Sequence, residues 1–319
     1  MNLLSTSYVY TLGYSKEEHS LCFLEMRALF GQVTEQPIIK SKVGIDPSRS
    51  PFIRERIEIL YEGETLQEII NQVKNIHMQD KTFKVIFSKI NDRKESESIQ
   101  YQERREIERQ VGWVIEGEAD VHKPDHTFGM ATMDGRWYFG HYQKSDAVWL
   151  KHVKKPREYS TALSTKDART IVNIAVPIVK DTRVIDPCCG IGTVLVEALS
   201  MGIDIEGRDI NPLVTTGARE NIAYFGFQGR VTLGPIQDVE DTFDVAIIDL
   251  PYNIATHATK EEQAAIIQHA RRISQKAVII TVEQMDEEIV QAGFHIMDRG
   301  FTQKGRFKRE ILVCEAQGL

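Results

Sequence analysis

Short apolar segments recur through the second half of the chain and alternate with segments whose apolar residues have helical spacing. The apolar segments predict strands at residues 183–185, 204–207, 231–233, 244–248 and 277–281. The helical pattern covers residues 193–200, 212–225, 261–273 and 286–292. Such alternation is typical of a parallel sheet covered by helices, which places the fold in the α/β class. The last two predicted strands, 295–301 and 310–315, have no helix between them, so we expect an antiparallel pair at one edge.

The first half of the chain has a less regular pattern. Strands are predicted at residues 7–12, 54–60 and 82–88, and helices at residues 17–29, 63–73 and 101–114. Residues 127–133 and 136–141 are separated only by Asp134 and Gly135, and this dipeptide between alternating apolar segments is a strong hairpin signal. The first half is therefore predicted to be an α+β region.

A polar and basic segment, residues 151–157, separates the two halves. It contains three lysines, one arginine and Pro156, so it is either a solvated linker or a contact for phosphate groups. A length of 319 residues suits two or three domains. We predict domains at residues 1–60, 61–150 and 159–319, with a linker at residues 151–158.

The composition is that of an ordinary globular protein, with 42% hydrophobic and 27% charged residues. No signal-peptide pattern and no apolar run of membrane-spanning length is present, so we expect neither a leader nor a membrane anchor. None of the four cysteines forms a C-x-x-C pair, and the three histidines at 122, 126 and 141 lie on predicted strands and turns that would scatter them. We therefore expect no metal, and a reducing cytoplasm.

The net charge of −7 bears on the choice of partner. Residues 1–157 carry equal numbers of acidic and basic side chains, so the whole deficit arises from residues 158–319. An acidic total speaks against a nucleic-acid partner, but the first half is neutral and has local basic clusters. Nucleic acid therefore stays open as a partner.

One stretch with candidate chemistry is the glycine-containing turn at residues 186–193, between a predicted strand and a predicted helix. Gly190 and Gly192 would let the backbone approach a ligand closely, although glycine turns also close strands for structural reasons. About 20 residues further on, Asp209 ends the next strand, where a carboxylate commonly accepts hydrogen bonds from ribose hydroxyls. The alternative role for Asp209 is helix capping, but Asn211 already occupies the position expected of the cap.

A second candidate is the tetrapeptide Asp249-Leu250-Pro251-Tyr252, which ends a predicted buried strand. Ligands of open α/β sheets bind at the carboxyl ends of the strands, so this corner is expected beside the glycine turn. Asp249 brings a carboxylate and Leu250 a backbone carbonyl to this corner, and Tyr252 brings an aromatic ring.

These motifs resemble those of class I S-adenosylmethionine-dependent methyltransferases that modify exocyclic amines, whose hallmark is an Asp/Asn-Pro-Pro-aromatic tetrapeptide. Leu250 replaces the first proline of that pattern. The resemblance implies a Rossmann-like seven-stranded methyltransferase sheet, S-adenosyl-L-methionine as cofactor and catalytic roles for Asp249, Leu250, Pro251 and Tyr252. In these roles the Asp249 carboxylate and the Leu250 carbonyl would accept hydrogen bonds from the exocyclic amine, whose lone pair is otherwise delocalised into the base. Tyr252 would stack on the base and position its nitrogen. It also implies that the cofactor is bound by three parts of the second half: the segment just before residue 164, the glycine turn, and the residues that follow the strands at 204–207 and 231–233. The residues implied are Thr161, Leu163, Asp186, Cys188, Gly190, Gly192, Thr193, Asp209, Ile210 and Asp238.

The first half is similar to the entry domain and the THUMP domain of certain tRNA methyltransferases. A strand and helix at the start resemble a ferredoxin-like domain, and residues 120–125 ahead of the paired strands resemble the end of a THUMP RNA-binding module. The whole chain resembles THUMP-containing tRNA guanosine-N2 methyltransferases, which implies methylation of guanosine N2 in tRNA near position 10. The alternatives are an exocyclic amine of rRNA or of DNA (adenine N6), and a non-catalytic RNA-binding protein; a protein partner stays unknown.

Overall fold

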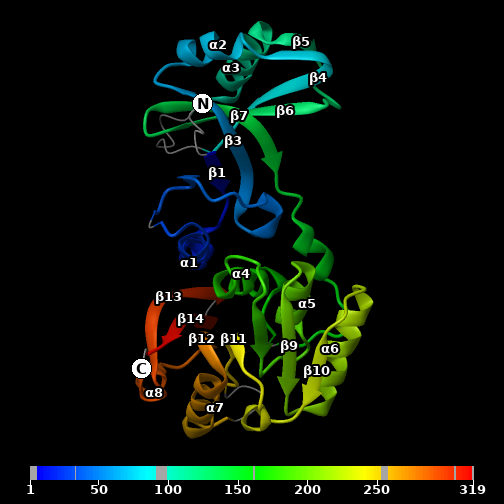
Figure 1. The fold of residues 1–319 in the computed structure, drawn as a ribbon, viewed down its shortest axis with the longest axis vertical. Coiled ribbons are helices and arrows are strands. Elements are labelled where there is room, and N and C mark those ends of the chain that lie inside the picture. The colour runs from blue at the N-terminus through cyan, green and yellow to red at the C-terminus, as the bar shows by residue number, and fades with distance from the viewer. Residues whose placement is uncertain are drawn as a thin grey trace. The chain divides into compact units, whose positions relative to one another are not determined.

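The computed structural model describes residues 6–32, 34–90, 99–160, 162–252, 258–304 and 307–317 of the chain. They form two compact units, a smaller one made of Met1–Gly13 and Thr34–Asp146 and a larger one made of Tyr14–Val33 and Ala147–Leu319 (Figure 1). No helix of the described part is both long and apolar enough to span a bilayer.

In the described residues, the smaller unit is a seven-stranded sheet with the two helices α2 and α3 on it. Its strand order is β2-β1-β3-β7-β6-β4-β5, in which β4 runs parallel to both β5 and β6 and the other pairs are antiparallel. The strands are β1 (Tyr8–Leu12), β2 (Ile38–Ser41), β3 (Ile53–Gly63), β4 (His77–Phe87), β5 (Glu116–Ala119), β6 (His126–Met133) and β7 (Arg136–Lys144). The helices are α2 (Leu66–Val73) and α3 (Tyr101–Val114), whose apolar faces pack with Phe83, Phe128 and Phe139 in one core.

The hairpin predicted at Asp134-Gly135 is confirmed. Asp134 has φ 51° and Gly135 has φ 73°, as a two-residue turn with two left-handed positions requires.

One predicted domain boundary does not coincide with a division of the structure. The predicted break between residues 60 and 61 falls inside β3, and β3 pairs with both β1 and β7, so the described residues on the two sides of that break share one sheet. The ferredoxin-like and THUMP labels stay predictions.

The larger unit is the predicted α/β sheet, with strand order β10-β9-β8-β11-β12-β14-β13. The first five strands in this order are parallel, and β14 and β13 are antiparallel at the edge, which confirms the expected ending. The strands are β8 (Arg183–Asp186), β9 (Asp204–Asp209), β10 (Arg230–Leu233), β11 (Phe243–Asp249), β12 (Ser274–Thr281), β13 (Phe294–Lys304) and β14 (Phe307–Ala316).

Two groups of helices cover this sheet. Helices α4 (Thr165–Ala175), α5 (Thr193–Ser200) and α6 (Pro212–Tyr224) contact one another in series, and α4 also contacts β11 and β12. The second group comprises α7 (Lys260–Ile273), α8 (Asp286–Gln291) and the 3-10 turn η5 (Ile236–Asp238). Strand β11 alternates between them: Ala246, Ile248 and Leu250 join the core formed with α7, so Asp249 faces the opposite side.

An unexpected feature is that helix α1 (His19–Phe30), from the start of the chain, belongs to the larger unit. It contacts α4 and β13 (Figure 1). The Asn173 side chain of α4 donates to the buried Glu25 carboxylate at 2.7 Å, and Arg27 forms a two-pronged ion pair with Asp298 of β13 at 2.7 and 2.9 Å. The segment predicted at residues 159–319 is therefore incomplete without α1.

We expect Leu24→Ala to destabilise the larger unit by about 2–5 kcal/mol, because Leu24 is buried in α1 against Gly300 of β13 and its removal leaves a cavity. Met297→Ala on the same strand is the control, since Met297 is 59% exposed and should change stability by less than about 0.5 kcal/mol. Urea unfolding followed by near-ultraviolet circular dichroism measures both. Equal effects of the two substitutions would contradict the assigned packing of α1.

Candidate active site

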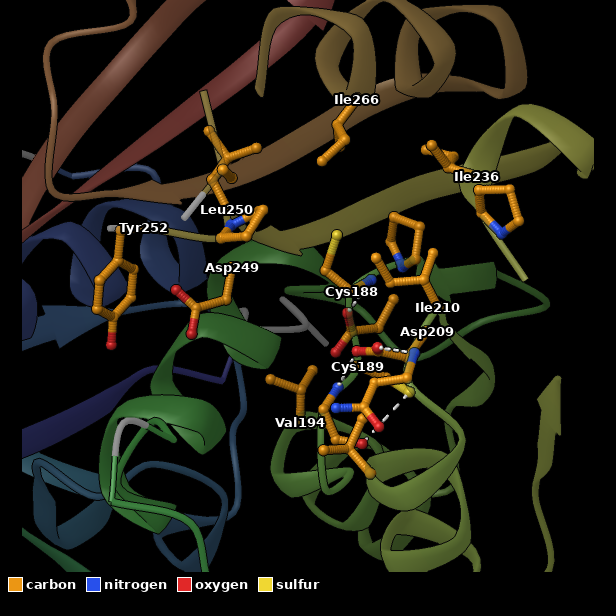
Figure 2. A pocket seen from close by; sticks show the side chains of 18 of the residues that line it. Cys188, Cys189, Val194, Asp209, Ile210, Ile236, Asp249, Leu250, Tyr252 and Ile266 are labelled. Carbon is orange, nitrogen blue, oxygen red and sulfur yellow. Dashed lines mark hydrogen bonds between the residues drawn. The ribbon is translucent and has the colours of Figure 1, made fainter. Parts of the chain in front are cut away.

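A cavity of about 600 Å³ lies at the carboxyl ends of β8, β9 and β11 in the larger unit (Figure 2). Both candidate motifs line it, so the glycine turn and the Asp249–Tyr252 corner share one cavity. Of the residues predicted to form the site, the cavity is lined by Leu163, Asp186, Cys188, Gly190, Thr193, Asp209, Ile210, Asp249, Leu250, Pro251 and Tyr252. Thr161 lies outside the described residues.

The turn after β8 is held in shape by hydrogen bonds to two acids. The Asp186 carboxylate accepts from the Cys188 amide at 3.2 Å, and the Asp209 carboxylate accepts from the Gly190 amide at 2.9 Å. Gly190 has φ 51°, and a Cβ there would meet no atom within 4 Å. Because Gly190 lines the cavity, its missing side chain leaves open space that a ligand can fill.

Gly192, unlike Gly190, does not line the cavity, and its role is structural. It has φ 76° and caps the start of α5, and a Cβ there would lie 3.1 Å from Ala218 Cβ of α6. Its lack of a side chain therefore permits the close approach of α5 and α6.

Asp209 contacts the start of α6, which bears on the capping alternative weighed from the sequence, and its role toward a ribose stays a prediction. Its second oxygen accepts from the Asn211 amide at 2.9 Å, while the Asn211 side chain caps α6 by accepting from the Leu213 amide at 2.9 Å. The capping position predicted for Asn211 is confirmed. Asp209 also lines the cavity, and carboxylate oxygens have more than one lone pair, so the hydrogen bonds to the turn leave acceptor capacity for a ribose hydroxyl.

The position of Asp238 differs from the prediction. Its carboxylate is 58% exposed, lies 3.8 Å from the Arg208 guanidinium and does not line the cavity. The residues of this loop that do line it are Pro235, Ile236 and Gln237. Arg272 of α7 donates to the carbonyls of Val239 and Gln237 at 2.7 and 3.1 Å and so fixes the loop in this orientation.

Helix α7 supplies lining residues that the sequence did not reveal. Glu262, Ile266 and His269 reach the cavity, at the spacing of one helical face. From the same helix, the buried Gln263 side chain donates to the Pro251 carbonyl at 2.9 Å and fixes the corner from behind. The helical pattern of residues 261–273 was visible in the sequence, but the face that turns toward the corner is set by packing.

The cavity is strongly acidic. Burial, together with the neighbouring carboxylates of Asp249 and Asp209, raises the pKa of Asp186 well above its ordinary value. Burial also raises the pKa of Asp249 to about 6, and the positive charge of Arg309 opposes this shift. The Cys188 thiol has a raised pKa for the same reasons, so it stays neutral.

The corner presents acceptors to the cavity. Asp249 Oδ1 is buried and has no hydrogen-bond partner among the described residues. The Leu250 amide donates to the Ile280 carbonyl of β12 at 2.9 Å, while in the described part of the chain no group donates to the Leu250 carbonyl. Figure 2 shows Asp249 and Tyr252 on one side of the cavity and Cys188, Cys189 and Asp209 on another.

These features fit the cofactor that the sequence implies. S-adenosylmethionine has a positively charged sulfonium and ammonium, which suit a cavity lined by the acidic side chains of Asp186, Asp209, Asp249 and Glu262, and Gly190 leaves space for it. Ile210 and Ile236 add apolar surface to the lining of the cavity that Asp209 also borders.

Residues 153–295 match the family described as UPF0020: RMKL-like, methyltransferase domain. With its sheet order and its cavity, the larger unit is a class I methyltransferase domain whose cofactor is S-adenosylmethionine. The chain is also 26% identical over 269 residues to a tRNA (guanine(10)-N2)-dimethyltransferase of Methanothermobacter thermautotrophicus, covering 78% of this chain and 79% of that protein. The predicted resemblance to THUMP-containing tRNA guanosine-N2 methyltransferases is thereby confirmed.

Two further similarities extend the comparison. The chain is 24% identical over 198 residues to the U6 snRNA (guanine-N(2))-methyltransferase THUMPD2 of Mus musculus, covering 58% of this chain and 35% of that protein. The crystal structure of TrmN from Thermus thermophilus superimposes with a TM-score of 0.48 at 14% identity, covering 97% of this chain and 99% of that one.

The replacement of proline by Leu250 leads to a prediction. We expect Leu250→Pro to lower the free energy of unfolding by about 2–5 kcal/mol, because proline removes the hydrogen bond to Ile280 and a leucine side chain buried against α7. Leu250→Met keeps the amide and the volume and should cost less than about 1.5 kcal/mol. Urea unfolding measures both, and a Leu250→Pro variant as stable as the wild type would show that neither contact holds the corner.

Burial of Asp249 predicts a pH-dependent stability. The pKa of Asp249 in the folded chain is about 6, above its unfolded value, so ionisation between these values weakens the folded state and the loss is complete above about pH 7. Asp249→Asn should therefore be more stable relative to wild type at pH 8 than at pH 4, by about 1–3 kcal/mol. Denaturant unfolding at both pH values measures this difference, and a difference that does not change with pH would contradict the buried charge.

Proposed function

We propose that this protein is an S-adenosylmethionine-dependent RNA methyltransferase that transfers a methyl group to N2 of guanosine, with tRNA as substrate and a site near position 10. The observation that carries the proposal is the Asp249–Leu250–Pro251–Tyr252 corner, which lines the same cavity as the glycine turn. The named activities of the two curated relatives, both guanine-N2 methylation of RNA, support the choice of base and nucleic acid. We place the protein in the cytoplasm, in agreement with its four free cysteines.

S-adenosylmethionine supplies an electrophilic methyl group when it is bound. The chain supplies the acceptors for the amine: the Asp249 carboxylate, with one oxygen unpartnered among the described residues, and the Leu250 carbonyl. Hydrogen bonds from the amine to these oxygens favour a pyramidal nitrogen with an available lone pair and offset its developing positive charge. The Asp249 carboxylate can also take the proton that the amine loses, since its pKa of about 6 leaves it mostly ionised at neutral pH.

Positioning comes from the surroundings of the corner. The Tyr252 ring is 8% exposed and borders the cavity, so its face can hold a base that has left its stack. The Gln263 side chain donates a hydrogen bond to the Pro251 carbonyl, so the Leu250 carbonyl is the backbone acceptor that remains for the amine at the corner. Fixing the base and its amine in this way lowers the entropic part of the barrier.

We expect Asp249→Ala to lower kcat for methyl transfer to unmodified tRNA by about 10²–10³-fold, because it removes the main acceptor for the amine. The matched control is Asp241→Ala, an exposed acid on the loop before β11, which should keep wild-type kcat. Transfer is measured with labelled S-adenosylmethionine, and N2-methylguanosine is identified by mass spectrometry of digested RNA. An Asp249→Ala variant with full activity would remove the catalytic assignment.

The substrate is tested with a panel of nucleic acids. A tRNA transcript, the same transcript with adenosine in place of guanosine 10, a U6 snRNA transcript, an rRNA fragment and duplex DNA are each incubated with the wild-type protein. The proposal expects N2-methylguanosine in the first and none in the second. N6-methyladenine in DNA, or RNA binding without any methylation, would instead support the alternative enzyme or the non-catalytic protein.

A further inference from the structure

Arg309 of β14 is buried next to the corner, although the sequence places it in a run of basic residues near the end of the chain. Its guanidinium Nη2 donates to the Tyr252 hydroxyl at 2.8 Å, and only 8% of the residue is exposed. The preceding Lys308 is exposed and its ammonium lies 3.8 Å from the centre of the Phe301 ring. Strand alternation therefore separates one arginine from its basic neighbour and turns it inward.

The Tyr252 ring is held at two points. Besides the hydrogen bond at its hydroxyl, its ring centre lies 5.5 Å from the Phe307 ring, in a tilted arrangement. The Arg309 guanidinium carbon lies 4.8 Å from the Phe307 ring centre and 5.5 Å from that of Tyr252. Arg309 and Phe307 of β14 therefore form a support for the side chain at the end of the corner.

The same guanidinium carries the positive charge that acts on the corner. It interacts with the Asp249 carboxylate and with Asp167 at the start of α4, and it lowers the pKa of each against the effect of burial. The Asp167 carboxylate also accepts from the Thr302 hydroxyl of β13 at 3.2 Å. Arginine keeps its charge at all accessible pH values, so its effect on both acids is permanent.

We propose that Arg309 is a positioning residue of the active site, which fixes the Tyr252 ring and sets a permanent positive charge beside Asp249. The inference rests on the proposed function, because Tyr252 and Asp249 are the groups assigned to the base and its amine. Arg309 itself does not line the cavity and so acts through them. Its loss should spare cofactor binding and change the rate of methyl transfer and its pH dependence.

The first test is the titration of the Asp249 carboxyl carbon by nuclear magnetic resonance, which needs no activity. We expect the midpoint to rise by about one pH unit in Arg309→Gln, which loses the charge, and to stay near the wild-type value in Arg309→Lys, which keeps it. The matched control Lys308→Gln removes an exposed charge one residue away and should leave the midpoint unchanged. An unchanged midpoint in Arg309→Gln, or an equal rise in Lys308→Gln, would overturn the electrostatic role.

The second test is kinetic. At pH values where Asp249 is fully ionised, kcat of Arg309→Gln should fall about tenfold or more through loss of ring orientation, with KM for RNA and for the cofactor within about threefold. The acid limb of its kcat profile should move by the same amount as the carboxyl midpoint. Adding Tyr252→Phe to Arg309→Gln should cost less than the product of the two single effects, since both act on one hydrogen bond.

The outcomes of the two tests separate the two proposals. A wild-type protein that methylates no guanosine contradicts the proposed function, while the carboxyl titration still decides the effect of Arg309 on Asp249. If Arg309→Gln does not fold, Arg309→Lys carries the test: lowered kcat with a preserved midpoint supports the positioning role. The ammonium of lysine cannot form the hydrogen bond to Tyr252 with the planar geometry of the guanidinium. An Arg309→Lys variant with wild-type kcat would therefore overturn the requirement for this hydrogen bond.

Discussion

Burial of carboxylates at the carboxyl edge of a parallel sheet is the constraint on which the rest of the site depends. Parallel pairing of β8 with β11 sets Val184 beside Val245 and Ile185 beside Ala246. Since Ile185 and Ala246 face the core with α7, alternation leaves Asp186 and Asp249 on the opposite face. The apolar strands thus bring both acids to one end of the sheet and withdraw them from water.

Such an arrangement costs folding free energy, because like charges in a poorly solvated cavity repel and desolvation opposes their ionisation. The raised pKa values of Asp186 and Asp249 express this cost. A ligand with positive charge offsets this cost, and the sulfonium of S-adenosylmethionine carries such a charge.

The sequence predicted those features that are determined locally. Helix α5 begins and ends where expected, and the turn and the corner lie in one cavity, because strand periodicity and chain order fix both. Features set by tertiary packing were not accessible. The exposure of Asp238 follows from contacts of the η5 loop with Arg208 and Arg272.

Two further features depend on segments distant in sequence. From the sequence, helix α1 is assigned to an N-terminal domain, because no local pattern identifies a packing partner far along the chain. Its contacts with α4 and β13 assign it to the larger unit. Likewise, basic residues near a hairpin usually lie in solvent, and only the contact with Tyr252 shows that Arg309 turns inward. A cue was present in the alternation of residues 307–310, but it could not say which face was buried.

The departure at Leu250 shows how the corner keeps its shape without a proline ring. A proline limits the backbone through its own ring, whereas Leu250 has an amide that bonds to Ile280 of the adjacent strand. Its side chain is anchored in the core beside α7, while Gln263 from that helix holds the Pro251 carbonyl and Arg309 from β14 holds Tyr252. Three neighbouring elements thus replace one local restraint, so the corner depends on the intact sheet, and the substitution leaves both the carboxylate and the Leu250 carbonyl available as acceptors.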